Sequence, residues 1–377
     1  MGSLIRLTKR RGYFIVLTNR LSRSAAASGN KPPKELFMKN RKLFRFSVRV
    51  LAVLLALLLP VSALGEEAGA SHAEAEDAFP WTLGDYLLPI DFTPGSAPDE
   101  NGYSESKDAN GNAVMVYEDS TIKVTVSQAT WMNTPILIAD VVISDPSQLR
   151  TASMGDGDFS KGKMSQGKVV TQAKHMNAVL AINGDSAYAK EKKEFGIIFR
   201  QGKQIHARLD ESGRFRMDLL LVDENGDFHG IHSAQPGDLD DPSVYEGRKI
   251  FNVFSFGPII VENGAVVTDY RGADRGTSEG GTWMVMRSGI DATRMVIGQA
   301  GPLHYKIFTS KGKRSGSRGL TLQELAEFIV TQDVQIAYNL DGGDSTVLYF
   351  RGKQVNPDTG NARALWDIIY FASAEKR

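Results

Sequence analysis

Asparagine and aspartate directly follow an apolar run at two places in the chain. The run AVLAI leads into Asn183-Gly184-Asp185, and the run VQIAY leads into Asn339-Leu340-Asp341 and then Gly342-Gly343-Asp344. Polar side chains placed where a buried strand ends are held on a rigid scaffold, and glycine lets a ligand approach the backbone closely. Carboxylates presented in this way suit proton transfer or cation binding. The alternative is an ordinary polar turn, because Asn-Gly and Asp-Gly are frequent turn sequences.

Two further places offer cations for an anionic ligand. Arg294 stands at the start of the apolar run RMVIGQ, where its planar guanidinium could clamp an anionic group. Lys313 and Arg314 lie in the loop SKGKRSGSRGL, which precedes a predicted helix and could cradle phosphate near the N-terminus of that helix. The alternative for this loop is a solvated, flexible tip.

The sequence gives little support for a metal site or for a serine nucleophile. There is no cysteine, and His229 and His232 have no third ligand at a known spacing. Asp341 and Asp344 could hold Ca²⁺, but the sequence signal for this is weak, because the loop lacks the ligand pattern of an EF-hand. The tripeptide Gly-Asp-Ser occurs twice, as in some esterases, but no histidine follows His304 to activate a serine. We therefore expect no cofactor.

The elements that must position these residues are short strands and a few helices. Capping residues Thr321 and Glu324 precede apolar residues with helical spacing, and a second helix is predicted over Gly167 to Asn177. Short β-rich stretches separated by turn residues are AVLAI, AVMVYE, TIKVTVSQ, PILIADVVIS, RMDLLLVD, KIFNVFSF, PIIVENGAVV, TWMVMRSG, RMVIGQ, LHYKIFTS, VQIAYNL, TVLYF and LWDIIYFAS. The pattern predicts an α+β fold with mainly antiparallel or mixed β-sheet and a few packed helices.

The charge distribution separates the N-terminal region from the rest. The chain has 377 residues, with 44 basic and 44 acidic ones. Thirteen of the basic residues but a single acid lie in residues 1–49, which leaves 31 basic and 43 acidic residues downstream. A basic head before an apolar run is a targeting pattern rather than a nucleic-acid surface, so we expect no nucleic-acid partner.

The apolar run at residues 50–65, VLAVLLALLLPVSALG, predicts export. It is short for a membrane span, which needs about 20 apolar residues, and it ends in small residues after a proline. We expect residues 1–37 to be an over-extended, unstructured start and 38–65 to be a signal peptide or an uncleaved anchor. An acidic linker over 66–112, which could dock through Trp81 and Tyr86, would then precede a single catalytic domain over 113–377. The absence of cysteine fits a bacterial secreted or cell-surface protein.

The stretch SRGLTLQELAEFIVTQDVQIAYNLDGGDST resembles the signature of the phosphodiester glycosidase family. Three further blocks of that family occur in the same order, namely AVLAINGD, SFGPIIVENGAVV and TRMVIGQ. The resemblance implies an extracytoplasmic hydrolase that cleaves the glycosidic bond of sugar-1-phosphodiesters, such as GlcNAc-1-phosphodiesters, in cell-wall or exopolysaccharide material. The partner would be a carbohydrate or sugar-phosphate substrate.

The resemblance also suggests roles for the residues singled out above. Such a reaction passes through an oxocarbenium-like transition state and needs a carboxylate, a cation for the departing phosphate and polar groups for the sugar. We expect Asp341 to be the catalytic base or nucleophile and Asp185 to be a second acid/base candidate. The expected substrate-binding residues are Asn183, Gly184, Arg294, Arg314, Asn339, Gly342, Gly343 and Ser345.

Two departures from the family pattern leave other functions open. Asp185 and Asp344 stand where relatives usually have glycine, and both add negative charge beside the expected pocket. A non-catalytic glycan-binding protein on the same fold is therefore one alternative. A phosphodiesterase that uses a metal at Asp341 and Asp344 is another.

Overall fold

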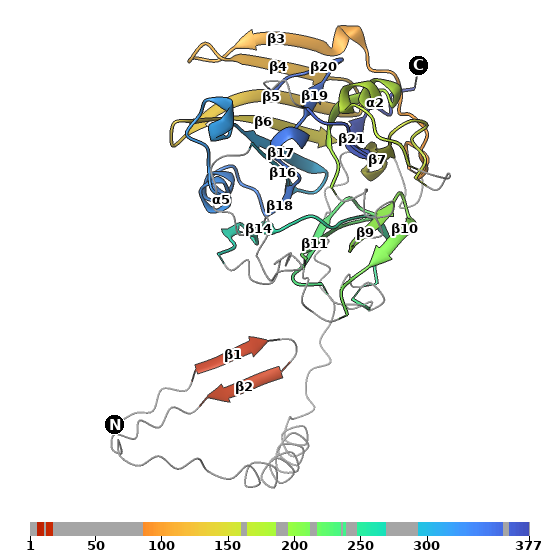
Figure 1. Ribbon diagram of the computed structural model, residues 1–377. Coiled ribbons are helices and arrows are strands. Elements are labelled where there is room, and N and C mark those ends of the chain that lie inside the picture. The colour runs from red at the N-terminus through yellow and green to blue at the C-terminus, as the bar shows by residue number, and fades with distance from the viewer. Residues whose placement is uncertain are drawn as a thin grey trace, which may run out of the picture. The chain divides into compact units, whose positions relative to one another are not determined.

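The computed structural model describes ten segments of the chain. These are residues 6–10, 13–17, 86–159, 164–185, 195–211, 217–234, 237–238, 247–268, 293–356 and 362–376. The chain divides into two compact units, Met1–Glu76 and Asp77–Arg377, which are taken separately below. Strands and helices keep the labels of Figure 1.

In the first unit the described residues form one antiparallel pair of strands, β1 (Arg6–Arg10) and β2 (Tyr13–Leu17). This differs from the expectation that residues 1–37 are unstructured. The sequence of β2, YFIVL, explains the strand, because aromatic and β-branched residues favour extended backbone. The predicted export segment at residues 38–65 lies outside the described residues.

A nine-stranded antiparallel sheet forms the largest part of the second unit (Figure 1). Its strands, in spatial order, are β15 (Ala265–Val266), β14 (Ile259–Glu262), β18 (Ile336–Leu340), β16 (Arg294–Gly301), β17 (His304–Ser310), β6 (Thr134–Ile143), β5 (Ile122–Trp131), β4 (Ala113–Glu118) and β3 (Tyr103–Lys107). Alternate residues of β5, such as Ile122, Val124 and Val126, are buried, as expected for a strand with one face on the core.

Two smaller antiparallel sheets complete this unit. One has the order β20 (Lys353–Gln354), β19 (Leu348–Phe350), β8 (Ala178–Asn183), β21 (Asp367–Ala372) and β7 (Leu149–Ser153). The other has the order β10 (Lys203–Arg208), β9 (Gly196–Arg200), β13 (Ile250–Phe254), β11 (Leu219–Asp223) and β12 (Phe228–Ile231). Side chains from all three sheets share one core, in which Val124, Leu180 and Phe254 represent one sheet each.

Both predicted helices are confirmed. Helix α5 (Leu322–Val330) begins at Thr321, which exchanges capping hydrogen bonds with Glu324, and its apolar face covers one face of the large sheet. Helix α2 (Val169–His175) packs on β8 and β21. Four 3₁₀ turns occur among the described residues, η1 (Glu100–Gly102), η2 (Pro146–Gln148), η4 (Lys313–Ser315) and η5 (Gly343–Ser345).

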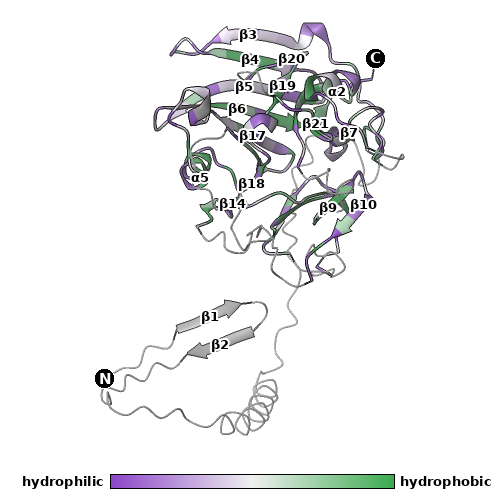
Figure 2. Cartoon of the chain, in the orientation of Figure 1, coloured by the Kyte–Doolittle hydropathy of each residue, from purple (hydrophilic) through white to green (hydrophobic). Residues whose placement is uncertain are grey.

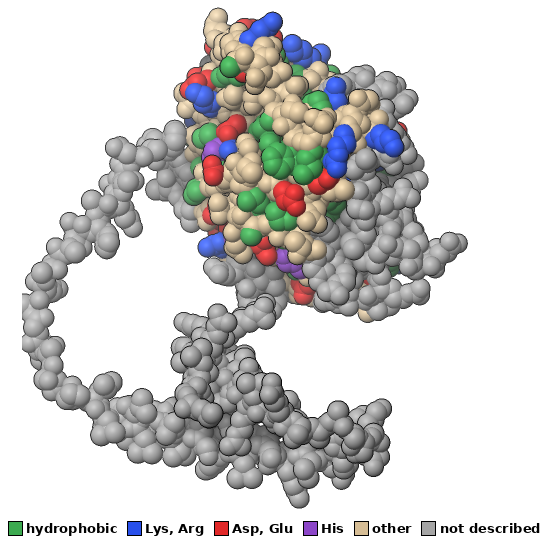
Figure 3. All heavy atoms as spheres, turned by 90° about the vertical axis from the view of Figure 1, so that its left-hand side faces the viewer, with side chains coloured by type: hydrophobic (Ala, Val, Ile, Leu, Met, Phe, Trp, Pro, Cys, Tyr) green, Lys and Arg blue, Asp and Glu red, His purple; other side chains and the backbone are tan. Residues whose placement is uncertain are grey.

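The distribution of hydrophobic residues along the strands of the second unit agrees with this burial. Hydrophobic residues concentrate in paired strands such as β4, β6, β19 and β21 (Figure 2). On the face that carries α5, acidic and basic side chains are interspersed around a small group of hydrophobic ones (Figure 3).

No helix in the described segments is both long enough and apolar enough to cross a bilayer.

The predicted α+β class with mainly antiparallel sheet is confirmed, since every strand pair in the described segments is antiparallel. The strand expected at TWMVMRSG, like Trp81, lies outside those segments. The folded body begins upstream of the expected start at Ala113. Leu88 and Phe92 are buried, β3 pairs with β4, and the ring of Tyr86 lies 5.3 Å from that of Phe251.

Candidate active site

The two strand ends singled out in the sequence meet in the structure, although they belong to different sheets. Asn183 ends β8, and its Nδ2 donates to the carbonyl oxygen of Asp341, which follows β18, at 2.9 Å. The Oδ1 atom of Asn183 accepts from the backbone N–H of Val347 at 3.3 Å. The side chain is fully buried. Asn183 therefore fixes the backbone of the Asp341 loop, and its amide is already engaged by protein groups.

The carboxylate of Asp341 is held by two side chains. Its Oδ2 atom accepts from the Ser345 hydroxyl and from Nη2 of Arg363, each at 2.5 Å. Arg363 also donates through Nε to the Ser345 hydroxyl at 2.5 Å. The Asp341 side chain is 13% exposed, whereas that of Arg363 is 56% exposed. The three side chains thus place an oriented carboxylate and an accessible cation next to each other.

Glycine is required where the Asp341 loop lies against the start of β16. A Cβ on Gly342 would stand 2.5 Å from the carbonyl oxygen of Thr293. Gly343 has φ 61° and donates its N–H to that same oxygen at 2.9 Å, while the Thr293 hydroxyl donates to the carbonyl of Gly343 at 2.8 Å. The two glycines shape the loop and bring it onto the strand that carries Arg294.

Arg294 and Asp341 are neighbours across two paired strands. Met295 of β16 is paired with Leu340 of β18, so Arg294 and Asp341 each stand one residue beyond the same pair. Burial lowers the pKa of the Arg294 guanidinium, which nevertheless stays charged at neutral pH. The backbone register therefore places the residue that carries this cation beside the one that carries the carboxylate.

Arg294 is flanked by two buried polar side chains, each of which can form a further hydrogen bond. Ser310 is paired directly with Arg294, and Asn339 is paired with Val296, two residues along the same face of β16. Ser310 is 1% exposed and Asn339 is 4% exposed. Neither the Ser310 hydroxyl nor Oδ1 of Asn339 has a hydrogen-bond partner among the described residues. Unsatisfied buried polar atoms are costly, so this end of the sheet is suited to a polar ligand or to water.

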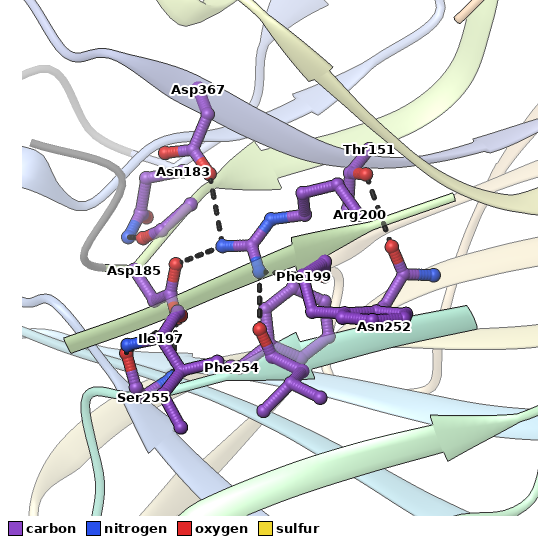
Figure 4. A network of polar contacts seen from close by, with 12 residues as sticks. Thr151, Asn183, Asp185, Ile197, Phe199, Arg200, Asn252, Phe254, Ser255 and Asp367 are labelled. Carbon is purple, nitrogen blue, oxygen red and sulfur yellow. Dashed lines mark hydrogen bonds and ion pairs between the residues drawn. The ribbon is translucent and has the colours of Figure 1, made fainter. Parts of the chain in front are cut away.

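Asp185 lies in a buried ion cluster (Figure 4). Its Oδ1 atom pairs with Nη2 of Arg200, and its Oδ2 atom accepts from the backbone N–H of Ser255 at 2.6 Å. The same Arg200 nitrogen lies 3.4 Å from Oδ2 of Asp367. The Asp185 carboxylate has no exposed surface in its side chain. This geometry is that of a group that orders the strand ends, and it differs from the expected acid/base role.

Gly184 is needed because the carboxyl group of Asp367 lies against its backbone. A Cβ at Gly184 would stand 2.0 Å from Oδ1 of Asp367. Burial raises the pKa of Asp367 to about 7, with Arg200 opposing the shift and Asp185 adding to it. Gly184 therefore serves the packing of this ion cluster, although the sequence suggested a ligand contact.

The sequence profile of the phosphodiester glycosidase family matches residues 176–372, which contain the Asp341 loop, Arg294, Arg363 and the buried cluster. The chain belongs to the phosphodiester glycosidase family. As a member of it, the protein is a hydrolase of the glycosidase type that acts on phosphodiester-linked sugars. No curated protein matches the chain.

Solved structures with some similarity to this phosphodiester glycosidase are remote. The catalytic domain of zebrafish N-acetylglucosamine-1-phosphodiester alpha-N-acetylglucosaminidase, auto-inhibited by its pro-peptide, is 18% identical with a TM-score of 0.49. That alignment covers 74% of this chain and 87% of the zebrafish one. A hypothetical protein from Synechocystis is 14% identical with a TM-score of 0.45, over 71% of this chain and 68% of the other.

The basic loop of this phosphodiester glycosidase does not offer the expected helix N-terminus. The Thr321 hydroxyl accepts from the N–H of Glu324 at 3.1 Å, and the Glu324 carboxylate accepts from the N–H of Thr321 at 2.9 Å. Arg318 pairs with Glu324 at 2.7 Å, and this pairing contributes most to lowering the pKa of that carboxyl to about 2. The Glu324 carboxylate therefore already occupies the N-terminus of α5, where a phosphate could have bound. Arg314 lies in η4, and its side chain is outside the described part of the structure.

Three residues of this phosphodiester glycosidase's candidate site were not singled out from the sequence. They are Arg363, which contacts Asp341, and the buried pair Arg200 and Asp367. Each lies in a segment without a glycine-rich turn or recognisable spacing, so the family resemblance at the Asp341 loop gave no signal for them. The described segments hold no group of three His, Cys, Asp or Glu side chains arranged to bind a metal.

Proposed function

We propose that this enzyme hydrolyses the glycosidic bond of sugar-1-phosphodiesters, of the GlcNAc-1-phosphodiester kind, in cell-wall or exopolysaccharide material outside the cytoplasm. The observation that carries the proposal is the Asp341 carboxylate with the exposed guanidinium of Arg363 on one of its oxygens. An acidic group beside an accessible cation matches a reaction in which an anomeric carbon becomes cationic while phosphate departs. The apolar segment at residues 50–65 supports a location outside the cytoplasm.

Asp341 has one oxygen to spare for the reaction. Among the described residues, hydrogen bonds to its carboxylate reach Oδ2 alone, from Ser345 and Arg363. Oδ1 is thus the atom that would attack the anomeric carbon as a nucleophile or take a proton from the attacking water as a base. The fixed Oδ2 atom keeps Oδ1 in one orientation, which is the main contribution a positioned catalytic group makes.

The cations Arg363 and Arg294 would receive the leaving group. When the bond between the anomeric carbon and the phosphate oxygen breaks, its electron pair stays on the phosphate, which leaves as a monoester. Arg363 can contribute its exposed N–H groups, and Arg294 is close by on β16. Guanidinium groups hold phosphate through paired hydrogen bonds, so no strong general acid is required. Ser310 and Asn339 would then offer their unused polar atoms to the substrate.

One assay tests this function. The full-length chain is incubated with a GlcNAc-1-phosphodiester, with and without a chelator, and the products are separated. Release of free GlcNAc in the presence of chelator supports the proposal. GlcNAc-1-phosphate would instead mean cleavage on the phosphate side, and binding without any product would mean a glycan-binding protein. Either of these two results overturns the proposal.

A further inference from the structure

A cavity of about 400 Å³ lies at the end of β8 that is remote from Asp341. Ala178, the first residue of β8, lines this cavity, whereas Asn183, the last, contacts Asp341. Five steps along a strand separate these residues by about 16 Å. Helix α2 and the β19–β20 hairpin, which lie together in Figure 1, supply further walls. The cavity is therefore distinct from the candidate active site, and its volume is typical of a ligand site.

Three cations from two elements line this cavity. Lys174 comes from the last turn of α2, and Arg351 and Lys353 come from the β19–β20 hairpin. Lys174 and Lys353 are exposed, and neither forms an ion pair with a described carboxylate. Glu100, the acidic residue in the lining, lies 3.6 Å from Arg351, but its side chain is 97% exposed. Such an exposed pair is weak, and the charged side chains of the lining, three cations and one carboxylate, leave an excess of positive charge.

Arg351 is held in place as a fixed cation. Its Nη2 donates to the carbonyl oxygen of Asp99 at 3.1 Å, and its guanidinium carbon lies 5.0 Å from the ring centre of Tyr117. The Arg351 side chain is 13% exposed. The two lysines, by contrast, carry their ammonium groups on solvated side chains. One rigid cation flanked by two adaptable ones suits a ligand whose negative charges are spaced along a chain.

We propose that this cavity binds a phosphate-bearing glycan or polyol chain as a non-catalytic anchoring site. The argument is charge complementarity. Residues 50–377 carry 31 basic against 43 acidic side chains, so a polyanion is repelled by the body as a whole and attracted where unpaired cations gather. Asn177 adds polar groups to the same wall. The inference concerns binding and is independent of the bond cleaved at Asp341.

The test compares charge reversal inside and outside the cavity in the full-length protein. The probe is a poly(glycerol phosphate) chain, with neutral dextran for comparison, and affinity is measured by calorimetry at low and at physiological salt. The variant K174E/K353E reverses the two unpaired cations. The matched control K107E/K249E changes the net charge equally at two exposed lysines outside the cavity lining. Thermal unfolding of each variant verifies that it is folded.

We expect K174E/K353E to weaken polymer binding by at least about ten-fold at low salt, and the control pair to weaken it by less than about two-fold, since close charges dominate. Added salt should weaken binding by the wild type, because the charges are exposed to solvent. Hydrolysis of a small soluble diester should not change in K174E/K353E. Equal loss in both double variants, equal binding of dextran, or no binding by the wild type would overturn the inference.

Discussion

The guanidinium of Arg363 and the carboxylate of Asp341 form a direct ion pair at 2.5 Å, although 22 residues separate them in the chain. The Ser345 hydroxyl contacts both partners and closes the arrangement. The Arg363 side of this ion pair is exposed to solvent. Some of its N–H groups can therefore bind a substrate phosphate in place of Asp341. We therefore expect the cation and the carboxylate to act on the same substrate while each keeps the other oriented.

The replacement Asp341→Asn tests the carboxylate. We expect the rate of diester hydrolysis to fall by at least about two orders of magnitude, because an amide neither accepts a proton nor attacks the anomeric carbon. Asp344→Asn is the matched control, since Asp344 is exposed on the same loop, and it should keep most of the activity. Steady-state kinetics of both variants gives the answer. Wild-type activity in Asp341→Asn would show that the assignment is wrong.

Arg363 is tested by Arg363→Lys, which keeps the charge but loses the planar fork. We expect kcat/KM for the phosphodiester to fall by at least about ten-fold, because a lysine cannot serve Asp341, Ser345 and a phosphate together. A neutral aryl glycoside of the same sugar separates the roles. If Arg363 binds phosphate, the loss should be smaller for the aryl glycoside. An identical loss with both substrates would mean that Arg363 only positions Asp341 and does not bind the phosphate.

Gly184→Ala should destabilise the fold, because the new methyl group meets the carboxyl of Asp367 at 2.0 Å. Overpacking a well-packed interior costs about 1–3 kcal/mol of the free energy of unfolding. Gly301→Ala is the control, since a Cβ there meets nothing within 4 Å. Urea unfolding of both variants measures the difference. Equal stability of the two would mean that the Asp367 contact is readily relieved.

Asp367 predicts a pH dependence with a defined sign. Its folded-state pKa is raised to about 7, above the ordinary value of 3.8 for an aspartate. The folded protein therefore holds this proton more tightly, and the stabilisation that results is fully present below about pH 4 and is lost as the pH rises through about 7. Asp367→Asn removes this dependence. The free energy of unfolding of wild type relative to this variant should decrease between pH 4 and pH 8, and an increase would contradict the shift.

Elements with local signals could be predicted from the sequence. Helix α5 was expected because Thr321 and Glu324 cap it within four residues, and β18 because a short apolar run precedes a polar turn. β3 was not expected. Its sequence, YSESK, is polar because it is the edge strand of the large sheet and is mostly exposed. Local pattern thus missed β3, which needs only a neighbouring strand, and it also missed two buried strands, β7 with the sequence LRTAS and β9 with GIIFR.

The candidate site could be predicted in part. Asp341 and Arg294 were both singled out, but their adjacency depends on the pairing of β16 with β18, which sequence spacing does not reveal. Asp185 illustrates the converse. Its place after a strand suggested acid/base chemistry. In the structure, however, it is enclosed in a buried cluster by Arg200 of β9 and by Asp367, which lies 182 residues after Asp185 in the chain. Contacts between residues so far apart in the sequence depend on how the sheets assemble.

The amide of Asn183 joins the loop after β18 to the end of β8, and these strands belong to different sheets. The loop that carries Asp341 therefore acquires its contact with Asn183 only when the two sheets dock against each other. We expect a chain that has formed either sheet alone to lack this contact and to be inactive. Recovery of activity during refolding would accordingly report the docking of the sheets, and hydrolysis would begin abruptly rather than increase in stages as the strands form.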